Sequence, residues 1–186
     1  YVIERTNVNT IGTMTEGDKI LNAFFQSVTT RTAGYFTFDQ SALTNAGSFI
    51  SMVLMFIGGS PGGIAGGIKT TTIVAVFMAI MAEIKGNKEI SVFNRNIKKD
   101  TLRRAFVILT VSFFWIVLIA FCLTITEKNS DILDIMYETF SAFGTVGLSR
   151  NLTPYLSSLG KVFIILTMLF GKLGSLTVMY AIIPKE

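Results

Sequence analysis

The chain has 186 residues, of which 51% are hydrophobic and 15% are charged, and its mean hydropathy is +0.58. Because soluble domains usually carry about 25% charged residues, this composition predicts an integral membrane protein. The sequence has no histidine and a single cysteine, which excludes histidine-based metal sites, Ser–His catalytic pairs and an intrachain disulfide. The formal charge of +4 does not indicate binding to nucleic acid, because the basic residues are concentrated in one stretch, 83–104, as is typical of a cytoplasmic loop in a membrane protein.

The start of the chain is polar and resembles an aqueous loop. It begins with Tyr1 rather than Met and shows no apolar leader, so we expect it to be part of a longer protein. Residues 1–17 are predicted to form an extracellular loop. Asp18 is a good N-cap and predicts a helix over residues 18–29. This helix is too short to cross a bilayer, so we interpret it as a re-entrant pore helix.

The residues after this short helix have the composition of a cation filter. Residues 30–35 read Thr-Arg-Thr-Ala-Gly-Tyr and contain a Thr-x-Gly tripeptide. Small residues allow backbone carbonyls to line a narrow path and replace the water shell of an ion. Thr-x-Gly is also common in plain turns, and only its context favours a filter. The predicted ion-binding residues of this loop are Thr30, Arg31, Thr32, Ala33 and Gly34.

Residues 43–82 form an apolar segment that is too long for one membrane crossing. Fully helical, they would extend about 60 Å, roughly twice the hydrocarbon thickness. A run with one proline and six glycines interrupts them at 58–67 and predicts a broken helix with a gating loop inside the pore. Close helix packing through paired glycines is the alternative. The predicted gate residues of this run are Gly58, Gly59, Pro61, Gly62, Gly63, Gly66 and Gly67.

The second half of the chain is predicted to repeat this plan. Residues 83–104 are the most basic stretch and are assigned to the cytoplasm. The fourth pore repeat, 105–186, is predicted to consist of an outward helix 105–126, a pore helix 131–142, a filter 143–148 and a returning helix 155–183. The predicted ion-binding residues of the second filter are Phe143, Gly144, Thr145, Val146 and Gly147.

A shift of 113 positions aligns the two halves without a gap, from Asp18 against Asp131 to Gly58 against Gly171. The helix start, the filter and the break in the next helix then coincide. Transport proteins are often built from such repeats, with the ion path at their interface. We therefore predict an all-α integral membrane fold of repeated helix–re-entrant pore helix–helix units. Two similar hairpins that only pack together are the alternative.

Two basic residues lie inside this apolar plan. Lys172 is near the centre of the last apolar segment, where a cation costs roughly 3 kcal/mol, and we predict that it faces the cavity below the filters as part of the gate. Snorkelling or a structural salt bridge is the alternative. Arg31, inside the first filter, is expected to point away from the ion, toward a carboxylate such as Glu138.

Other function classes find little support in the sequence. Gly66–Thr71 partly matches a phosphate-binding loop, but Ile68 separates Gly67 from Lys69 and the flanks are membrane-length apolar segments. No nucleophile with a base, and no pair of carboxylates at membrane depth, is visible, so no enzyme is predicted. A non-transporting membrane scaffold and a nucleotide-binding membrane enzyme are the alternatives to ion transport.

Three segments, in this order and spacing, resemble the Trk/Ktr/HKT superfamily of potassium transporters: Ser27–Gly34, Gly59–Thr71 and Ser141–Ser149. The resemblance implies four pore repeats around one pore, of which this chain would hold the third, 18–82, and the fourth. It implies potassium bound at filter carbonyls, sodium as an activator, and a gating loop that works with Lys172. It also implies a multi-pass protein of the bacterial plasma membrane, a homodimer, and a cytosolic nucleotide-binding subunit of the KtrA/TrkA type. Without the first two repeats, the chain would not close a filter alone.

Overall fold

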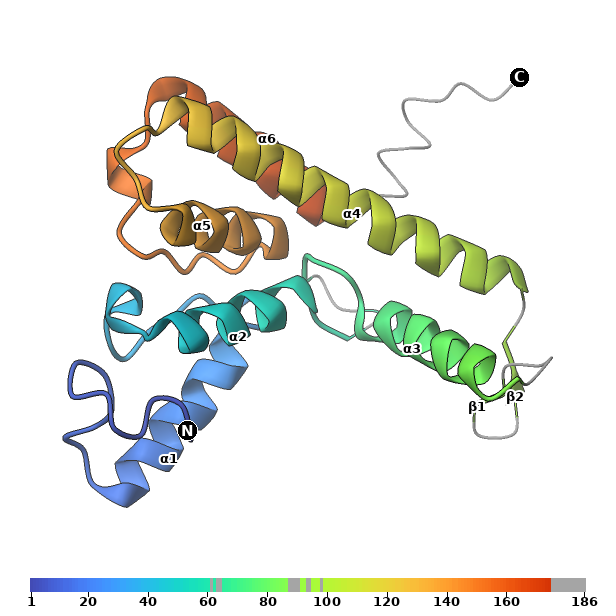
Figure 1. Ribbon diagram of the computed structural model, residues 1–186, viewed down its shortest axis with the longest axis horizontal. Helices are drawn as coiled ribbons and strands as arrows, with labels where there is room; N and C mark the ends of the chain where they lie inside the picture. The colour runs from blue at the N-terminus through green and yellow to red at the C-terminus, as the bar shows by residue number, and fades with distance from the viewer. Residues whose placement is uncertain (61, 63–64, 87–90, 93–94, 98, 175–186) are drawn as a thin grey trace.

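The structure is a computed structural model that describes residues 1–60, 62, 65–86, 91–92, 95–97 and 99–174. It confirms the predicted helical fold, to which a pair of two-residue antiparallel strands is added between two helices (Figure 1). The elements in chain order are α1 (Glu16–Thr29), the 3-10 helix η1 (Gln40–Ala42), α2 (Asn45–Phe56), α3 (Thr70–Ile84), β1 (Ser91–Val92), β2 (Arg95–Asn96), α4 (Lys99–Thr126), α5 (Ile132–Gly144), the 3-10 helix η2 (Thr153–Tyr155) and α6 (Ser158–Leu173).

Helix α4 has 28 residues and is, within the described part of the chain, the one helix long and apolar enough to cross a membrane. At 1.5 Å per residue it extends about 42 Å. It begins at Lys99 rather than at the predicted residue 105, so the basic loop is shorter than expected. Asp100 lies in its first turn, where a negative charge complements the helix dipole. Helices α2 and α3 are apolar but shorter.

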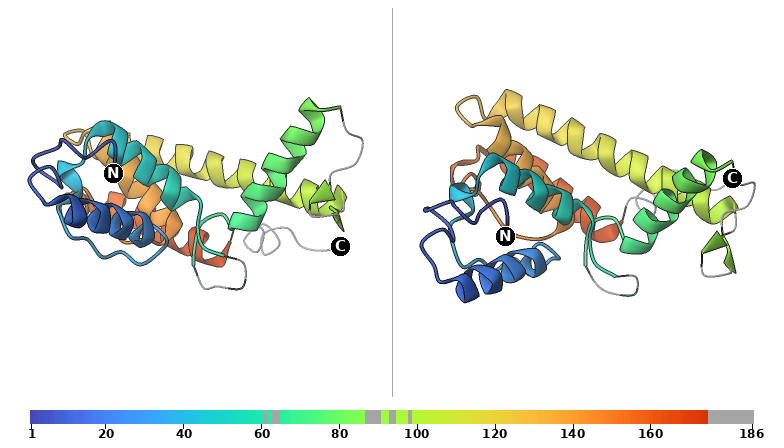
Figure 2. Two further views of the ribbon diagram at one scale, coloured as in Figure 1. Left: turned by 90° about the horizontal axis from the view of Figure 1, so that it is seen from below. Right: turned by 60° about the horizontal axis from the view of Figure 1, so that its bottom comes forward.

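The short helix α5 lies at the centre of the second half of the molecule. It packs against α2, α4 and α6, while α3 packs against the other end of α4 (Figures 1 and 2). Apolar residues on several faces allow this position: Ile135 and Tyr137 are both at most 1% exposed. Near its carboxyl end, Trp115 of α4 stacks on Phe170 of α6 with ring centroids 4.3 Å apart. Helix α5 is therefore mostly buried toward its carboxyl end, whereas Ile132 in its first turn is exposed.

The two short helices start with different caps. Helix α5 is capped as predicted by Asp131, whose side chain accepts a hydrogen bond from the backbone of Leu133. In α1 the prediction was wrong: Thr15 is the N-cap and its hydroxyl accepts from the backbone N–H of Asp18. The Asp18 carboxylate in turn accepts from the Thr15 hydroxyl at 2.7 Å. Both residue types favour caps, and this reciprocal bonding places the helix start at Glu16.

Three other predicted boundaries differ from the structure. Helix α5 continues to Gly144, so the first two residues of the predicted filter 143–148 belong to its last turn. The apolar segment 43–82 consists of α2 and α3, and the interruption between them covers residues 57–69 rather than the predicted 58–67. Helix α6 starts three residues after the predicted 155, because η2 with its proline occupies the preceding turn. Helix α6 ends at Leu173, where Gly174 is the C-cap, and residues 175–183 of the predicted helix lie outside the described residues.

Candidate functional site

The two predicted filter loops share a backbone conformation that side-chain-bearing residues rarely adopt. Thr32 has φ 69° and Gly34 has φ 77°; at the paired positions, Thr145 has φ 53° and Gly147 has φ 91°. Threonine is β-branched, so a positive φ is an outlier that costs on the order of 1–3 kcal/mol. Such strain is kept where the surroundings or the function require it. The same threonine outlier appears in both loops, and in each loop a glycine with positive φ follows it two residues later.

Alternation of left-handed residues with a residue of negative φ changes the direction of the peptide groups. In an ordinary extended strand successive groups point to opposite sides. When left- and right-handed conformations alternate, successive peptide groups can point to the same side. Residues 32–34 and 145–147 both have this alternation. The arrangement is therefore capable of presenting a row of carbonyl oxygens to one ligand.

The two loops are in direct contact. A Cβ atom added to Gly34 would lie 2.3 Å from the carbonyl oxygen of Val146, so only glycine fits there. Around Gly147, by contrast, an added Cβ would meet nothing within 4 Å. The fold thus brings together the two predicted filters, which are more than a hundred residues apart in the sequence.

Each loop is bonded back to the helix that precedes it. In the first loop the N–H groups of Ala33 and Gly34 donate to the carbonyl of Thr29 at 3.2 and 3.3 Å. In the second, the N–H of Val146 donates to the carbonyl of Ser141 at 2.9 Å. These bonds fix the turn from the helix into the loop. The carboxyl end of each short helix, with its partial negative charge, therefore lies beside its loop.

Arg31 does not contact Glu138, which corrects the predicted pair. Its Nη1 donates to the carbonyls of Ile57 and Gly58 at 2.9 and 3.2 Å, where α2 ends. Carbonyls at a helix end lack partners within the helix, so a nearby guanidinium is a favourable donor. Glu138 instead accepts hydrogen bonds from the hydroxyls of Ser149 and Thr153, which lie in the segment that follows α5.

The glycine-rich run is tied together at its base. Gly58 and Ile68 are joined by a hydrogen bond of 2.9 Å between the N–H of Gly58 and the carbonyl of Ile68. The N–H of Ile68 donates to the carbonyl of Phe56 at 3.1 Å. The run therefore leaves the end of α2 and returns to the same place before α3 begins. Of the predicted gate residues, Pro61 and Gly63 lie outside the described residues.

The run also contacts the second filter loop. The N–H of Gly66 donates to Oγ1 of Thr145 at 3.2 Å, and a Cβ on Gly66 would lie 2.4 Å from that oxygen. Gly58 is equally tight, since its Cβ would lie 2.0 Å from the carbonyl oxygen of Gly66. Gly66 thus allows this segment to lie against Thr145 of the second loop.

Lys172 lies in the last described turn of α6, not near the middle of a helix as the sequence predicted. Together with Glu138, Thr145 and Gly147 it lines a cavity of about 430 Å³ beside the second loop. A lysine at this place brings a positive charge to the same space as two of the predicted filter residues.

Sequence reasoning missed a pair of glutamates that fix the helices after the loops. The Glu4 carboxylate accepts from the backbone N–H and the hydroxyl of Thr44, at 3.0 and 2.5 Å. The Glu127 carboxylate accepts from the same groups of Ser157, at 3.1 and 2.5 Å. Thr44 and Ser157 are the N-caps of α2 and α6. The two glutamates are 123 positions apart, so an alignment shifted by 113 positions does not pair them.

A glycine makes room for each of these carboxylates. A Cβ on Gly47 would lie 2.2 Å from a Glu4 oxygen, and one on Gly160 would lie 2.3 Å from a Glu127 oxygen. Burial alone would raise the pKa of Glu4, but hydrogen bonds from Thr44, Asn7 and Thr10 outweigh it and lower the pKa. A cap hydroxyl, a glycine three residues later and a buried glutamate therefore form one device, present twice.

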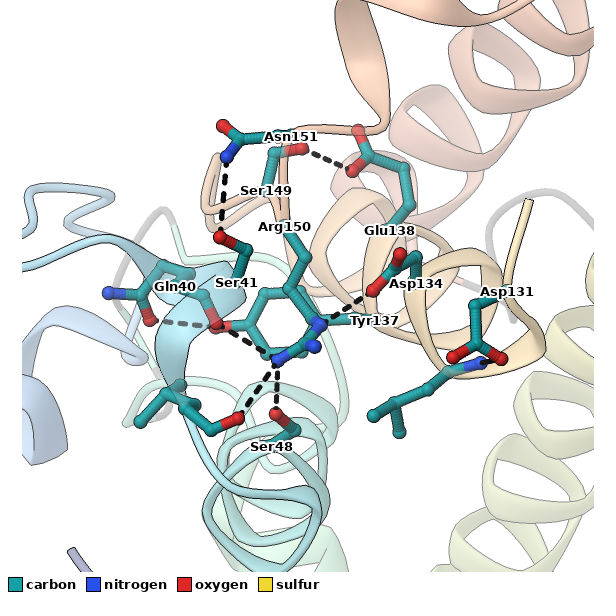
Figure 3. Close-up of polar contacts among 12 residues, drawn as sticks. Gln40, Ser41, Ser48, Asp131, Asp134, Tyr137, Glu138, Ser149, Arg150 and Asn151 are labelled. Atoms are coloured by element: carbon teal, nitrogen blue, oxygen red, sulfur yellow. Dashed lines mark hydrogen bonds and ion pairs between the residues drawn. The ribbon is translucent and has the colours of Figure 1, made fainter. Parts of the chain in front are cut away.

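A further group of contacts surrounds Arg150, which sequence reasoning did not single out (Figure 3). Arg150 joins Asp134 on α5 to Ser48, near the amino end of α2. Nearby, the hydroxyl of Tyr137 donates to the side-chain oxygen of Gln40 at 2.9 Å. Arg150–Ser48 and Tyr137–Gln40 are pairs more than 90 residues apart in the sequence, which no local pattern could have indicated.

Comparison with known proteins now gives the family. Residues 2–186 match the family described as TrkH, cation transport protein. The chain belongs to this family. Its TrkH-type fold agrees with the solved potassium transporter TrkH from Vibrio parahaemolyticus, with a TM-score of 0.81 at 19% identity over 98% of this chain and 40% of that one.

Two bacterial relatives show how much of a TrkH-family protein this chain represents. It is 38% identical over 186 residues to the Ktr system potassium uptake protein B of Bacillus subtilis, of which it covers 42%. It is 40% identical over 188 residues to the potassium/sodium uptake protein NtpJ of Enterococcus hirae, of which it covers 41%. The chain thus spans about two fifths of the length of these relatives.

Proposed function

We propose that this chain is part of the ion-translocating subunit of a bacterial potassium uptake system, and that its two loops contribute to a selectivity filter. The observation that carries the proposal is the left-handed backbone at Thr32 and Thr145, kept at a cost in strain in two loops that touch. The names of the two bacterial relatives, potassium uptake and potassium/sodium uptake proteins, support the same cargo.

In this mechanism the ligands of the ion are backbone carbonyls rather than acidic side chains. A potassium ion entering from outside would exchange its water shell for carbonyl oxygens of residues 30–34 and 143–147. The carboxyl ends of α1 and α5 would add partial negative charge that favours a cation. Two further repeats, from the rest of the full-length protein, would complete the ring of ligands.

The proposed arrangement in the bilayer follows the two predicted repeats, residues 18–82 (the first unit) and residues 105–186 (the second unit). Residues 1–17 lie outside, 18–82 form the third repeat, 83–104 lie in the cytoplasm and 105–186 form the fourth repeat. It is supported by the paired helix caps at Thr44 and Ser157 and by the match to the TrkH fold. Both loops then face the exterior, with the glycine-rich run on the cytoplasmic side of them.

The glycine-rich run is proposed to gate the path. Its Gly66 contacts the hydroxyl of Thr145, and Lys172 borders the cavity beside the same residue, so a cation leaving the filter would meet a narrow, positively charged passage. Deletion of residues 60–66 is expected to raise ion flux, measured as rubidium uptake at equal amounts of protein in the membrane. Unchanged or lower flux would favour a packing role.

The proposed assembly has further components. We infer a homodimer of the full-length subunit and a cytosolic nucleotide-binding subunit of the KtrA/TrkA type. The designation of the Bacillus relative as one protein of a Ktr system supports an assembly of several proteins. Sodium is proposed as an activator, as the family resemblance implies; the Enterococcus relative is named for uptake of both potassium and sodium.

The test of the filter uses the full-length protein in a bacterial strain that lacks potassium uptake. Gly147→Asp is expected to abolish potassium uptake, because its side chain would occupy the space beside the filter backbone. Gly86→Asp is the matched control: Gly86 also has a positive φ and open space around it, but lies after α3, far from the loops. Membrane insertion is checked by blotting of membrane fractions. Normal uptake by Gly147→Asp would refute the filter assignment.

A further inference from the structure

Arg150 leaves the second loop three residues after Gly147 and turns its side chain inward. The side chain is only 10% exposed. On one side its Nε donates to Oδ1 of Asp134 on α5 at 2.7 Å, which forms an ion pair (Figure 3). This contact holds the outgoing end of the second loop on the helix that precedes the loop.

On the other side the same guanidinium contacts the first unit. Its Nη1 donates to Oγ of Ser48 on α2 at 2.7 Å and to the carbonyl of Gln40 at 3.0 Å. A longer contact of 3.4 Å reaches the carbonyl of Leu43. One side chain therefore joins α5 of the second unit to η1 and α2 of the first (Figure 3).

Gln40 extends this connection to the other short helix. Its side-chain oxygen accepts from Gln26 on α1 at 2.6 Å and from the Tyr137 hydroxyl on α5 at 2.9 Å. Asn151, next to Arg150, donates to the Asp39 carboxylate at 3.1 Å. The two helices that end at the two loops are thus linked through Gln40, whose backbone Arg150 also binds.

The guanidinium is well suited to this position. It is planar and always charged, and presents donors in a fixed fork, so it can bind a carboxylate and carbonyls at once without changing shape. Hydrogen bonds to ionised groups are stronger than neutral ones, particularly where water is largely excluded. The residue paired with Arg150 by the 113-position shift is Thr37, so the first unit has no arginine at this place.

We propose that Arg150 is a positioning residue for ion selection, which holds the two filter loops at a fixed separation. Gly34 already touches the carbonyl of Val146, so a small displacement of α5 against α2 would change the distances between the carbonyls of the two loops. Fixed separation favours the larger potassium ion, whereas loops that can approach one another would also accept sodium. The inference rests on the proposed filter function.

The test measures potassium and sodium uptake by the full-length protein carrying Arg150→Gln. We expect the apparent KM for potassium to rise about tenfold, as the loss of a charge-assisted bond predicts, with a smaller change in maximal rate. The ratio of sodium to potassium uptake is expected to rise with it. Arg150→Lys keeps the charge without the fork and should show most of this shift. Arg103→Gln, on the exposed start of α4, is the control and should behave as wild type.

Asp134→Asn provides a second variant. It removes the ion pair between Arg150 and α5, which is one end of the bridge that Arg150 forms between α5 and α2, while keeping side-chain size. It should raise the same ratio, and combined with Arg150→Gln should add little, because both changes break one connection. If the wild-type protein takes up no potassium, the proposed function itself fails. If wild type transports potassium but Arg150→Lys and Asp134→Asn keep its KM and ion ratio, Arg150 serves stability alone and this inference is overturned. These two variants decide the question even where Arg150→Gln does not accumulate in the membrane.

Discussion

The two loops, 30–35 and 143–148, share a positive φ at two paired positions but carry their charged side chains at different places. Thr32 and Thr145 are both left-handed, as are the glycines two residues later. Arg31, however, is paired by position with a glycine, and its guanidinium binds the end of α2 within its own unit. The arginine of the second unit, Arg150, follows the loop and binds across to the first unit.

This difference separates two kinds of requirement. The backbone conformation is costly at a β-branched residue, and its presence in both loops indicates a requirement that both share. The arginines satisfy local needs that differ: Arg31 supplies donors to the carbonyls at the end of α2, and Arg150 joins neighbouring units. A comparison of variants at paired positions can therefore distinguish residues that shape the proposed ion path from residues that hold the units together.

The largest expected effect comes from the two glycines that follow the left-handed threonines. Gly34→Ala should abolish uptake, because the new methyl group would meet the Val146 carbonyl as well as the unfavourable φ. Gly147→Ala adds only the backbone penalty of about 1–2 kcal/mol, since nothing lies within 4 Å of the added atom. We expect it to retain reduced uptake. Rubidium uptake measures both variants, and Gly86→Ala, left-handed and open but distant, is the control. Equal activity of the two loop variants would contradict direct contact between the loops.

The two buried glutamates should contribute alike to stability. Glu4→Ala and Glu127→Ala each leave an N-cap residue without its carboxylate partner, and each is expected to cost about 1–3 kcal/mol in the free energy of unfolding. Their effects should add within about 0.5 kcal/mol, because they share no contact. Unfolding of the purified protein in detergent measures this.

Glu16→Ala is the control for the glutamate pair. Glu16 is 56% exposed and its ion pairs with Arg5 and Lys19 lie at the surface, where solvent screens them, so its loss should cost clearly less stability than the loss of Glu4 or Glu127. A cost at Glu4 or Glu127 no larger than at Glu16 would show that the repeated cap device contributes little to the fold.

Arg31→Gln sharpens the comparison of the two arginines. It removes a charged donor from the end of α2 and should lower the free energy of unfolding by about 1 kcal/mol. Because its bonds stay within the first unit, the ratio of sodium to potassium uptake should stay that of wild type, in contrast to Arg150→Gln. A changed ratio in Arg31→Gln would mean that the end of α2, and not only the bridge between units, controls the loop.

The sequence could predict those features that depend on local pattern. Two short apolar segments, each beginning with a polar capping residue and followed by Thr-x-Gly, indicated the two short helices and their loops. A proline among several glycines indicated the interruption after α2. Exact helix starts were less predictable, since Thr15 and Asp18 are both good caps only three residues apart. Gly144 has a low helix propensity, yet it is the last residue of α5, where an added Cβ would lie 2.6 Å from the Met55 carbonyl oxygen of α2.

Partners distant in the sequence could not be predicted. The sequence offers Glu138 as one carboxylate partner for Arg31, but carbonyls at the end of α2 are also good acceptors, and Arg31 binds the carbonyl of Ile57. The contact of Glu127 with Ser157, and of Arg150 with Ser48, depends on how the helices pack. The 113-position shift also assumes equal loop lengths, whereas the loop after Glu4 is longer than the loop after Glu127.

The smallest expected effect is a pH dependence that arises at Glu4. Its pKa lies below the ordinary value of 4.5 because hydrogen bonds from Thr44, Asn7 and Thr10 outweigh the effect of burial. A carboxylate with a lowered native pKa stabilises the fold above its unfolded pKa and loses that contribution as the pH falls through the native value. Glu4→Gln cannot titrate, so its melting temperature, measured from about pH 6 to about pH 3, should fall less steeply than that of wild type. Asp39 and Glu16, whose pKa values are also lowered, titrate in both proteins and cancel in the comparison. Parallel curves would show that the cap at Thr44 holds equally well with a protonated carboxyl, and that the charge of Glu4 is not what fixes the start of α2.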